Sequence, residues 1–523
     1  MRVISKEQIA SLLFVFLICW SCSPKEQALD KPNIILIYAD DLGIGMLGHE
    51  GQQIIKTPNI DRLAQEGLRF DRAYSNMLCA PARASLITGL QDTHENMFEI
   101  TSGGVYKRID RKEASYETVD SLINAALPPV PIDQVFLGEV AKKSGYVTGQ
   151  FGKLEWGFSA TDSQMKRHGW DNYMGYFDHQ RAHGFYPAFL FEDGKQVNIE
   201  GNTLANSGKS NEPETEAAFK ERWNMEGKKV YSQDIFMDKA LSFISDNKDN
   251  PFFLYFPTQL PHGPVSIPAV HPDFVDDSRL TQIEKEYASM VKLLDDNVGQ
   301  IMARLSELNI QDNTIVIFAA DNGHEIYYSQ EGRVLKPYTN METGERFDGL
   351  ESKYYSDRGG DIFNGNGGRA GLKRSNLQGG INVPLIIKWP EKIRAGSTSN
   401  RLVANYDILP TIAEITGFSK AHNSDGISFY PELIEEENTE HEFIVYGSFI
   451  GPTLITNDGW KIRTHLKKEA FELFYLPDDF QEENDLSEKY PDRFLALKAK
   501  LLQACDGDFN NGLHSFRNYV RIQ

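Results

Sequence analysis

Residues 32–41 read PNIILIYADD, and this short run predicts the centre of a buried sheet. Residues 32–39 are apolar and β-branched without alternation, a pattern typical of a strand that is buried on both faces. The run stops at two adjacent carboxylates, Asp40 and Asp41, and a glycine-rich loop follows. In open α/β sheets, functional sites form beyond the carboxyl ends of the strands, so we expect a site here.

Strands and helices alternate along the chain on both sides of this run. Further strands are predicted at residues 146–151, 252–256, 314–319 and 383–388, and helices at residues 57–67, 136–143 and 283–305. This alternation predicts an α/β fold in which helices sandwich a large, mostly parallel mixed sheet. Lys153, His262 and the pair Asp321-Asn322 also follow strands, so these groups are expected to share one site with the two aspartates.

The pattern changes after residue 417. Short strands at residues 443–448, 453–465 and 471–475 and a helix at residues 491–503 predict a small antiparallel α+β subdomain. The expected division is a signal segment at residues 1–22, a main α/β domain at residues 30–420 and a C-terminal subdomain at residues 421–523.

Composition narrows the class of protein. The 523 residues include 54 basic and 74 acidic side chains, which gives a net charge of −20, and hydrophobic residues make up 41%. These values exclude a disordered, collagen-like or polytopic membrane protein. The charge argues against a nucleic-acid partner, because phosphate binding needs a basic field. An anionic substrate must therefore be attracted by local positive groups.

The N-terminus is expected to export the protein. Arg2 and Lys6 precede an apolar run at residues 9–20 that is too short to span a bilayer and fits a secretory signal. Cys22 follows the small Ser21 and precedes a polar stretch, which resembles a bacterial lipoprotein signal. We expect a protein of the periplasm, outer membrane or cell surface, with a lipid on Cys22 as its membrane contact. An ordinary cleaved signal peptide and an uncleaved anchor are the alternatives.

Cys79 needs an explanation of its own. Cys79 and Cys505 are the cysteines left in the folded part, and residues so far apart make a poor disulfide framework. Residues 79–89 read CAPARASLITG, which resembles the signature of the type I sulfatases, Cys-x-Pro-x-Arg before a short helix. Pro81 and Arg83 match that signature. Further stretches that resemble the family are PNIILIYADDLG, TPNIDRLAQEGLRFDRAYS, GYVTGQFGK, LPHGP, ADNG, LQGGINVPLIIKWP and FELFYLPDD.

The resemblance implies an alkaline phosphatase-like fold and hydrolysis of sulfate esters. In that family a maturation enzyme oxidises the cysteine, here Cys79, to formylglycine, whose hydrate attacks sulfur to give a covalent sulfo-enzyme and then releases sulfate. The implied metal is Ca²⁺, in preference to Mg²⁺, beside a formylglycine oxygen. Its ligands would be Asp40, Asp41, Asp321 and Asn322. Such oxygen donors suit either hard cation, although each residue alone is common in turns and caps.

Other implied roles concern the sulfate and the leaving group. Arg83 would stabilise the formylglycine hydroxyl, and Lys153 and Lys373 would bind sulfate oxygens as point charges. His262 would protonate the leaving alcohol, a task that suits a group titrating near neutrality. For Lys373, a solvated loop lysine is the alternative.

One position departs from the family pattern. The family usually has GKWHxG, whose histidine helps to remove a proton so that sulfate can leave, whereas this chain has GKLEWG with Glu155. A carboxylate can act as a base, but it repels sulfate unless Lys153 or the metal offsets its charge. We take Glu155 as the base. The alternatives are that another residue has taken over or that Glu155 contacts the substrate.

Residues 167–191 are rich in aromatic side chains and histidine, which suit contacts with sugar rings. Arg181 and His183 are the expected subsite residues, whereas Trp170 and Phe185 are expected to pack beneath a loop. The expected substrate is a sulfated polysaccharide or oligosaccharide, with a carrageenan-like galactan preferred to a glycosaminoglycan. The rival functions are a phosphodiester or phosphonate hydrolase of the same superfamily and a non-catalytic lipoprotein that binds sulfated glycans.

Overall fold

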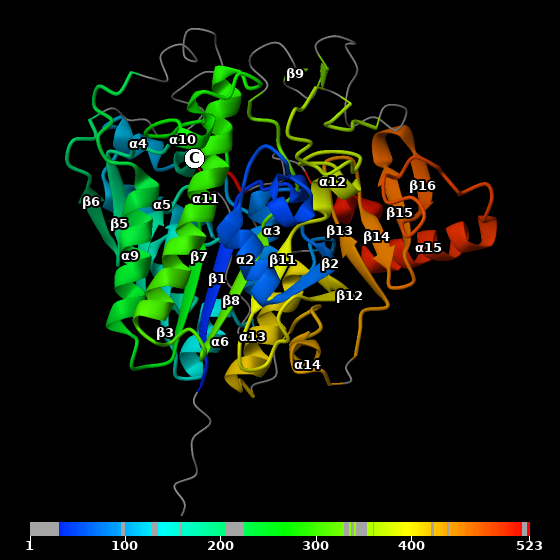
Figure 1. Cartoon of the computed structure of the whole chain (residues 1–523). Helices are drawn as coiled ribbons and strands as arrows, with labels where there is room; N and C mark the ends of the chain where they lie inside the picture. Colours follow the sequence, from blue (N-terminus) through cyan, green and yellow to red (C-terminus); the bar gives the residue numbers. More distant parts are fainter. Residues whose placement is uncertain are drawn as a thin grey trace, which may run out of the picture.

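The computed structural model describes the chain from residue 31 to residue 522 (Figure 1). Within this span the residues that it leaves undescribed are 96–99, 128–133, 157–158, 204–223, 329–333, 336–338, 341–352, 359, 420–422, 437–438 and 515–519. The predicted signal at residues 1–22, with Cys22, lies outside the described residues. Among the helices that are described, none is long and apolar enough to cross a membrane.

A ten-stranded sheet forms the centre of the fold, with the strand order β12-β2-β11-β8-β1-β7-β3-β4-β5-β6. Its strands are β1 (Asn33–Ala39), β2 (Leu68–Tyr74), β3 (Val147–Lys153), β4 (Asn172–Tyr176), β5 (Phe189–Glu192), β6 (Lys195–Asn198), β7 (Phe252–Pro257), β8 (Thr314–Ala320), β11 (Leu385–Lys388) and β12 (Ser397–Ala404). β1 lies between β7 and β8, parallel to both, and all of its residues are buried, as the apolar run predicts. Parallel pairing continues from β7 through β3 to β4.

Antiparallel strands make the sheet mixed. β11 runs antiparallel to both of its neighbours, β2 and β8, and β5 and β6 form an antiparallel edge. The sequence pattern predicts β11 but not β2, β4, β5, β6 or β12. β2 and β12 contain exposed polar residues, and β5 and β6 are only four residues long, so neither pair gives a long apolar run.

Alternate residues of β1 face two hydrophobic cores, which is why helices cover both faces of the sheet. Ile35 and Ile37 pack in one core, and Ile34 and Leu36 pack in the other. The first core contains α2 (Pro58–Glu66), α9 (Ser232–Asp246) and α11 (Gln282–Glu307), and the second contains α5 (Tyr116–Ala126), α6 (Leu137–Lys143) and α13 (Ile408–Thr416). Figure 1 shows α9 and α11 lying across one face. The predicted sheet sandwiched by helices is confirmed.

A separate four-stranded antiparallel sheet follows in the C-terminal part, as predicted. It contains β13 (Phe443–Tyr446), β14 (Thr453–Thr456), β15 (Trp460–His465) and β16 (Ala470–Tyr475), and α15 (Pro491–Ala504) packs against it. Residues 453–465, expected as one strand, form the hairpin of β14 and β15, because the chain turns at Gly459 with a φ of 90°. The boundary predicted at residues 420/421 falls in an undescribed segment and stays a prediction.

Candidate active site

The groups expected to share a site meet at the carboxyl ends of the central strands. Asp40 and Asp41 follow β1, Lys153 ends β3, and Asp321 and Asn322 follow β8. The other groups are Cys79 and Arg83 on α3 (Cys79–Thr88), His262 in the loop after β7, and Lys373 in the loop before α12 (Gln378–Ile381). All of these side chains are buried. Parallel strands bring residues that are far apart in the sequence to the same edge of the sheet.

The acidic residues and Asn322 form the oxygen-rich part of this site. The backbone N–H of Asp41 donates to Asp321 Oδ1 at 3.0 Å, and Asn322 Nδ2 donates to Asp41 Oδ1 at 2.7 Å. A carboxylate oxygen of Asp40, one of Asp321 and the sulfur of Cys79 lie within 4.8 Å of one another. Asn322 Oδ1 is buried and has no hydrogen-bond partner among the described residues. This set of donors fits a hard divalent cation.

Arg83 and Lys153 bring positive charge to these carboxylates. Arg83 Nη2 donates to Asp321 Oδ2 at 2.8 Å, and Lys153 forms an ion pair with Asp40. Burial nevertheless raises the pKa of Asp40 to about 8, because the attraction of Lys153 offsets it only in part. A divalent cation beside Asp40 would favour the ionised carboxylate, which is a second reason why a metal fits here.

Lys373 lies against Asp41. Its Nζ is 2.6 Å from Asp41 Oδ2 and 3.3 Å from His262 Nε2. Burial opposes the charge of Asp41, but Lys373, the hydrogen bond from Tyr327 and the charge of Lys153 together outweigh burial and hold the pKa of Asp41 below its usual range. Since Lys373 is only 4% exposed, the alternative of a solvated loop lysine is wrong.

His262 is oriented by its own loop. Its Nδ1 lies 2.5 Å from the carbonyl oxygen of Gly263, which favours the tautomer that carries hydrogen on Nδ1. Its Nε2 faces Lys373 at 3.3 Å and lies 3.4 Å from Asp41 Oδ2. The ring of His183 stacks on that of His262, with centroids 4.0 Å apart. The structure therefore places His183 at the site, where a subsite residue is expected.

Cys79 begins α3 and is buried. Burial raises the pKa of its thiol, so the unmodified side chain is a poor nucleophile. Arg83 lies one helical turn further along α3, on the same face, and its guanidinium stands 5.4 Å from the centre of the Tyr38 ring. The helix thus fixes the spacing between the two residues of the motif.

Arg181 is not available to a substrate. Its guanidinium is fully buried, and Nε donates to Asp110 Oδ2 at 2.8 Å while Nη2 donates to the carbonyl oxygen of Phe189 at 3.1 Å. The same group lies 3.8 Å from the centre of the Phe189 ring. The structure therefore gives Arg181 a structural role in place of the expected subsite contact. Trp170 and Phe185 are buried, in agreement with their expected packing.

Glu155, the expected base, is engaged elsewhere. Its carboxylate accepts hydrogen bonds from Trp170 Nε1 and from His168 Nδ1, the latter at 2.5 Å, and its side chain is 1% exposed. The ring of His168 is stacked against Phe136 and Trp156, with centroid distances of 3.8 and 4.7 Å. These contacts indicate a structural role for Glu155. Of the alternatives, they favour the one in which another residue has taken over.

His179 carries no motif of its own in the sequence, yet it lies beside Lys153. It follows β4, whose last residues pair with the end of β3. The imidazole is fully buried, and the nearby backbone of Leu154 and Glu155 favours its protonated form. Burial, together with the charges of Lys153 and Arg83, holds the pKa of His179 well below its usual range. The ring is therefore neutral, and its place after β4, next to the end of β3, makes it a candidate for the task expected of Glu155.

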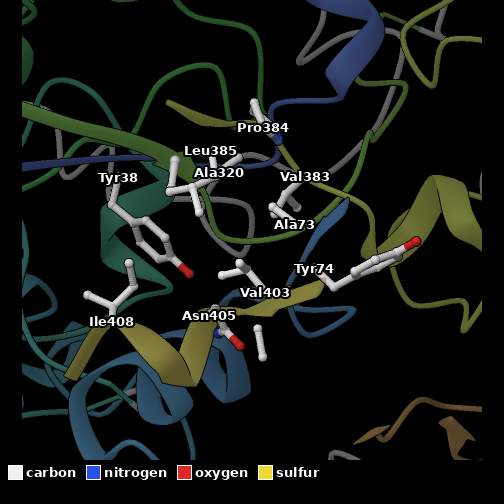
Figure 2. Close-up of a pocket in the computed structure, with 12 residues that line it drawn as sticks. Tyr38, Ala73, Tyr74, Ala320, Val383, Pro384, Leu385, Val403, Asn405 and Ile408 are labelled. Carbon is white, nitrogen blue, oxygen red and sulfur yellow. The ribbon is translucent and has the colours of Figure 1, made fainter. Parts of the chain in front are cut away.

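Figure 2 shows a small cavity of about 20 Å³ into which Tyr38 of β1 projects. Apart from Tyr74 and Asn405, the other labelled side chains around the cavity are apolar. A space of this size holds about one water molecule. It cannot receive a sugar ring, so this cavity is not the substrate site.

The sulfatase family model matches residues 32–418. The chain belongs to the sulfatase family. A second family model, for the C-terminal region of N-sulphoglucosamine sulphohydrolase, matches residues 372–505. This sulfatase is accordingly a sulfuric ester hydrolase with the alkaline phosphatase-like fold that the sequence resemblance implies.

Two relatives and a solved structure illustrate the similarity. N-acetylgalactosamine-6-sulfatase of Homo sapiens is 27% identical over 435 residues, which cover 80% of this chain and 69% of that protein. N-acetylgalactosamine-6-O-sulfatase of Bacteroides thetaiotaomicron is 26% identical over 521 residues, which cover 89% of this chain and 91% of that protein. The crystal structure of Ps i-CgsB in complex with k-i-k-neocarrahexaose shares the fold, with a TM-score of 0.66, 23% identity and coverage of 93% and 95%.

Proposed function

We propose that this sulfatase removes sulfate from a sulfated glycan and that Cys79, oxidised to formylglycine by a maturation enzyme, supplies its nucleophile. The observation that carries the proposal is the position of Cys79, whose sulfur lies within 4.8 Å of carboxylate oxygens of Asp40 and Asp321. Burial raises the pKa of the thiol, so a precursor role explains the residue better than a thiolate would. The hydrated aldehyde would supply a hydroxyl to attack sulfur.

The charges of the site suit an anionic ester. Ca²⁺, or less favourably Mg²⁺, would be held by Asp40, Asp41, Asp321 and Asn322. Such a cation would neutralise sulfate charge and lower the pKa of the attacking hydroxyl. The carboxylates of the site are balanced by Arg83, Lys153 and Lys373, so adding the cation makes the site locally positive within a protein whose net charge is −20.

Each protein group then has a separate task. Lys153 and Lys373 bind sulfate oxygens, and Arg83 stabilises the attacking hydroxyl. His262 holds a proton on Nδ1 against Gly263, and its Nε2, once protonated, can donate to the leaving alcohol.

The relatives support a sugar of galactose configuration as the substrate. Both are named as N-acetylgalactosamine sulfatases, one of Homo sapiens and one of Bacteroides thetaiotaomicron. We therefore propose a galactose-configured sulfate ester, which includes both carrageenan-like galactans and galactosamine-containing glycosaminoglycans. His183, stacked on His262, is the proposed contact to the sugar.

Mass spectrometry and turnover test the proposed chemistry together. Protein co-produced with a formylglycine-generating enzyme should show the aldehyde or its hydrate in the tryptic peptide that contains Cys79, and it should hydrolyse sulfated galactose oligosaccharides. Cys79→Ala is the control that must be inactive. Turnover by protein with an unmodified thiol would contradict the formylglycine role, and a higher kcat/KM for phosphonate or phosphate diesters would favour the rival hydrolase.

The metal has a test that does not need turnover. Adding Ca²⁺ to protein treated with a chelator should raise the melting temperature, because an ion that binds only the folded state stabilises it. Asp40→Asn should abolish this shift. An equal shift in both proteins would contradict the proposed ligands.

We also propose export and lipidation at Cys22, on the strength of residues 2–22. Labelled palmitate should enter the wild-type protein in a bacterial host that processes lipoproteins, and it should not enter Cys22→Ala. An unlabelled, soluble wild-type protein in the periplasm would instead indicate an ordinary signal peptide.

A further inference from the structure

Buried charged side chains of the C-terminal subdomain contact the chain segment that follows Lys373. Lys461 and Arg463 lie on β15, Glu482 follows β16, and all of these side chains are fully buried. Charged side chains are almost never buried without partners, so their contacts show what they hold. In Figure 1 the C-terminal sheet lies beside α12, the helix that follows the Lys373 loop.

Glu482 joins the C-terminal sheet to the start of α12. Its Oε2 accepts the backbone N–H of Gln378, the first residue of α12, at 2.6 Å. Its Oε1 lies 2.7 Å from Lys461 Nζ. Lys353 adds a hydrogen bond to the backbone carbonyl oxygen of Glu482. The position of the Gln378 backbone is therefore set by residues of another part of the chain.

Arg463 holds the same segment just before Gln378. Its Nε donates to Asn376 Oδ1 at 2.9 Å, and its Nη1 lies 2.9 Å from Glu472 Oε2. The amide of Asn376 also donates to the backbone carbonyl oxygens of Gly451 at 2.9 Å and Thr464 at 3.0 Å. Both polar atoms of the Asn376 side chain thus bind the C-terminal subdomain.

The other end of this segment lies in the active site. The backbone N–H of Lys373 donates to the carbonyl oxygen of His324 at 2.8 Å, and that of Arg374 donates to Met77 at 2.7 Å. Arg374 has a φ of 78°, a left-handed conformation that costs a non-glycine residue about 1 kcal/mol or more and persists only where the surroundings impose it. Contacts at both ends therefore hold the loop in a conformation that it would not adopt alone.

We propose that Glu482, Lys461 and Arg463 are positioning residues for Lys373, and that the C-terminal sheet is in this way part of the sulfate site. The inference rests on the proposed role of Lys373 as a sulfate ligand. Replacing a buried ion pair by apolar residues is often neutral or stabilising, so stability alone does not account for these charges. The need to place Lys373 accurately accounts for these charges, because a misplacement of about 1 Å at a catalytic group can cost about 100-fold in rate.

The test compares Glu482→Ala with a control that weakens the same subdomain elsewhere. Leu497 lies on α15 and packs in the core on the opposite face of the C-terminal sheet, away from Lys461 and Arg463. In formylglycine-bearing enzyme, we expect Glu482→Ala to weaken inhibition by inorganic sulfate about 10-fold and to lower kcat/KM for an aryl sulfate about 100-fold. Leu497→Ala should lower the melting temperature while leaving both constants within about two-fold.

A second variant separates charge from the hydrogen bond. Glu482→Gln combined with Lys461→Met removes both charges but keeps an oxygen that can accept the N–H of Gln378. This double variant should recover most of the sulfate affinity that Glu482→Ala loses, and it should do so even if Glu482→Ala folds poorly. A double variant as defective as Glu482→Ala, or a Leu497→Ala enzyme equally impaired, would overturn the inference.

Amide hydrogen exchange tests the same contacts by a measurement that does not depend on enzyme activity. In protein that still carries Cys79 as a thiol, the amides of Lys373 and Gln378 should exchange about 10-fold faster in Glu482→Ala and at the wild-type rate in Leu497→Ala. If the mature wild-type enzyme hydrolyses no sulfate ester, the proposed function fails. The exchange rates still test whether Glu482, Lys461 and Arg463 hold the segment from Lys373 to Gln378 in place. If Glu482→Ala changes neither these exchange rates nor the inhibition by sulfate, the proposed positioning of Lys373 is overturned.

Discussion

Glu155 accepts hydrogen bonds from Trp170 and His168, and an amide keeps only one of them unless His168 changes its tautomer. We therefore expect Glu155→Gln to lower the free energy of unfolding by about 1–3 kcal/mol. Because the carboxylate is occupied by Trp170 and His168, kcat for an aryl sulfate should stay within about three-fold. Urea denaturation and steady-state turnover measure the two effects. A sulfo-enzyme trapped in Glu155→Gln would restore the residue as the base.

His179 leads to the opposite expectation. His179 follows β4 next to the end of β3, so we take it as the candidate to remove the proton whose loss lets sulfate leave, and general base catalysis contributes about 10²–10⁴-fold. His179→Gln should therefore lower kcat by that factor, which is more than its loss of stability would explain. His168→Gln is the matched control, since it alters another buried histidine and should lower stability more than turnover. Full activity in His179→Gln would exclude it as the base.

Strand β4 places His179, and its approach to β3 depends on a pair of glycines. Gly175 lies opposite Gly152 in the parallel register, and a Cβ on Gly175 would stand 1.9 Å from the carbonyl oxygen of Gly152. We expect Gly175→Ala to push the strands apart, to cost about 2 kcal/mol of stability and to reduce turnover by displacing Lys153 and His179. Gly51→Ala is the control, because a Cβ there meets nothing within 4 Å and adds only the strain of its positive φ. Similar losses of turnover in both variants would argue against the strand contact.

The same strand shows which elements the sequence pattern could predict. β1, β7 and β8 are wholly buried and apolar except for Asn33 and Thr314, so they stand out, and the polar residues that follow them locate most of the site. β4 reads NYMGY and has no long apolar run, so the pattern does not predict this strand, and it groups His179 only with the histidines of residues 167–191 that suit contacts with sugars. The expected subsite role of Arg181 is wrong because its partner Asp110 lies 71 residues earlier, a pairing that no local pattern reveals. Residue type can suggest a role, but only the folded chain shows which side chains are already occupied.

The net charge of the whole molecule opposes the binding of a polyanionic substrate. The net charge is −20, and a sulfated polysaccharide carries many negative charges that extend beyond the site. Raising the salt concentration from about 0.01 M to about 0.15 M shortens the screening length from about 30 Å to about 8 Å, which weakens this long-range repulsion first. We therefore expect kcat/KM for a polymeric substrate to rise over this range, and that for a monosulfated aryl ester to change less. A fall for the polymer would show that a positive surface outside the site dominates.

His94 joins distant parts of the chain through charge. Its Nε2 lies 3.2 Å from Asp425 and its Nδ1 lies 3.2 Å from Asp506, which follows α15. The hydrogen bond with Asp425, with further help from Asp506, raises the pKa of His94 from 6.5 to about 9. The folded protein thus binds this proton more tightly than the unfolded chain does. Its stabilising effect is complete below about pH 6.5 and is lost as the pH rises through about 9.

His94→Gln should therefore lose stability in a pH-dependent way. The side chains of His94, Asp425 and Asp506 are about one-third exposed, so solvent screens their interaction. We therefore expect the free energy of unfolding to fall by about 1 kcal/mol near pH 6, and this loss should shrink toward zero above about pH 9. Urea denaturation of wild type and variant across this range measures the difference. Adding Asp506→Asn to His94→Gln should then cost little more, because the charge that Asp506 faces is already gone. A loss of equal size at every pH would mean that His94 contributes packing rather than charge.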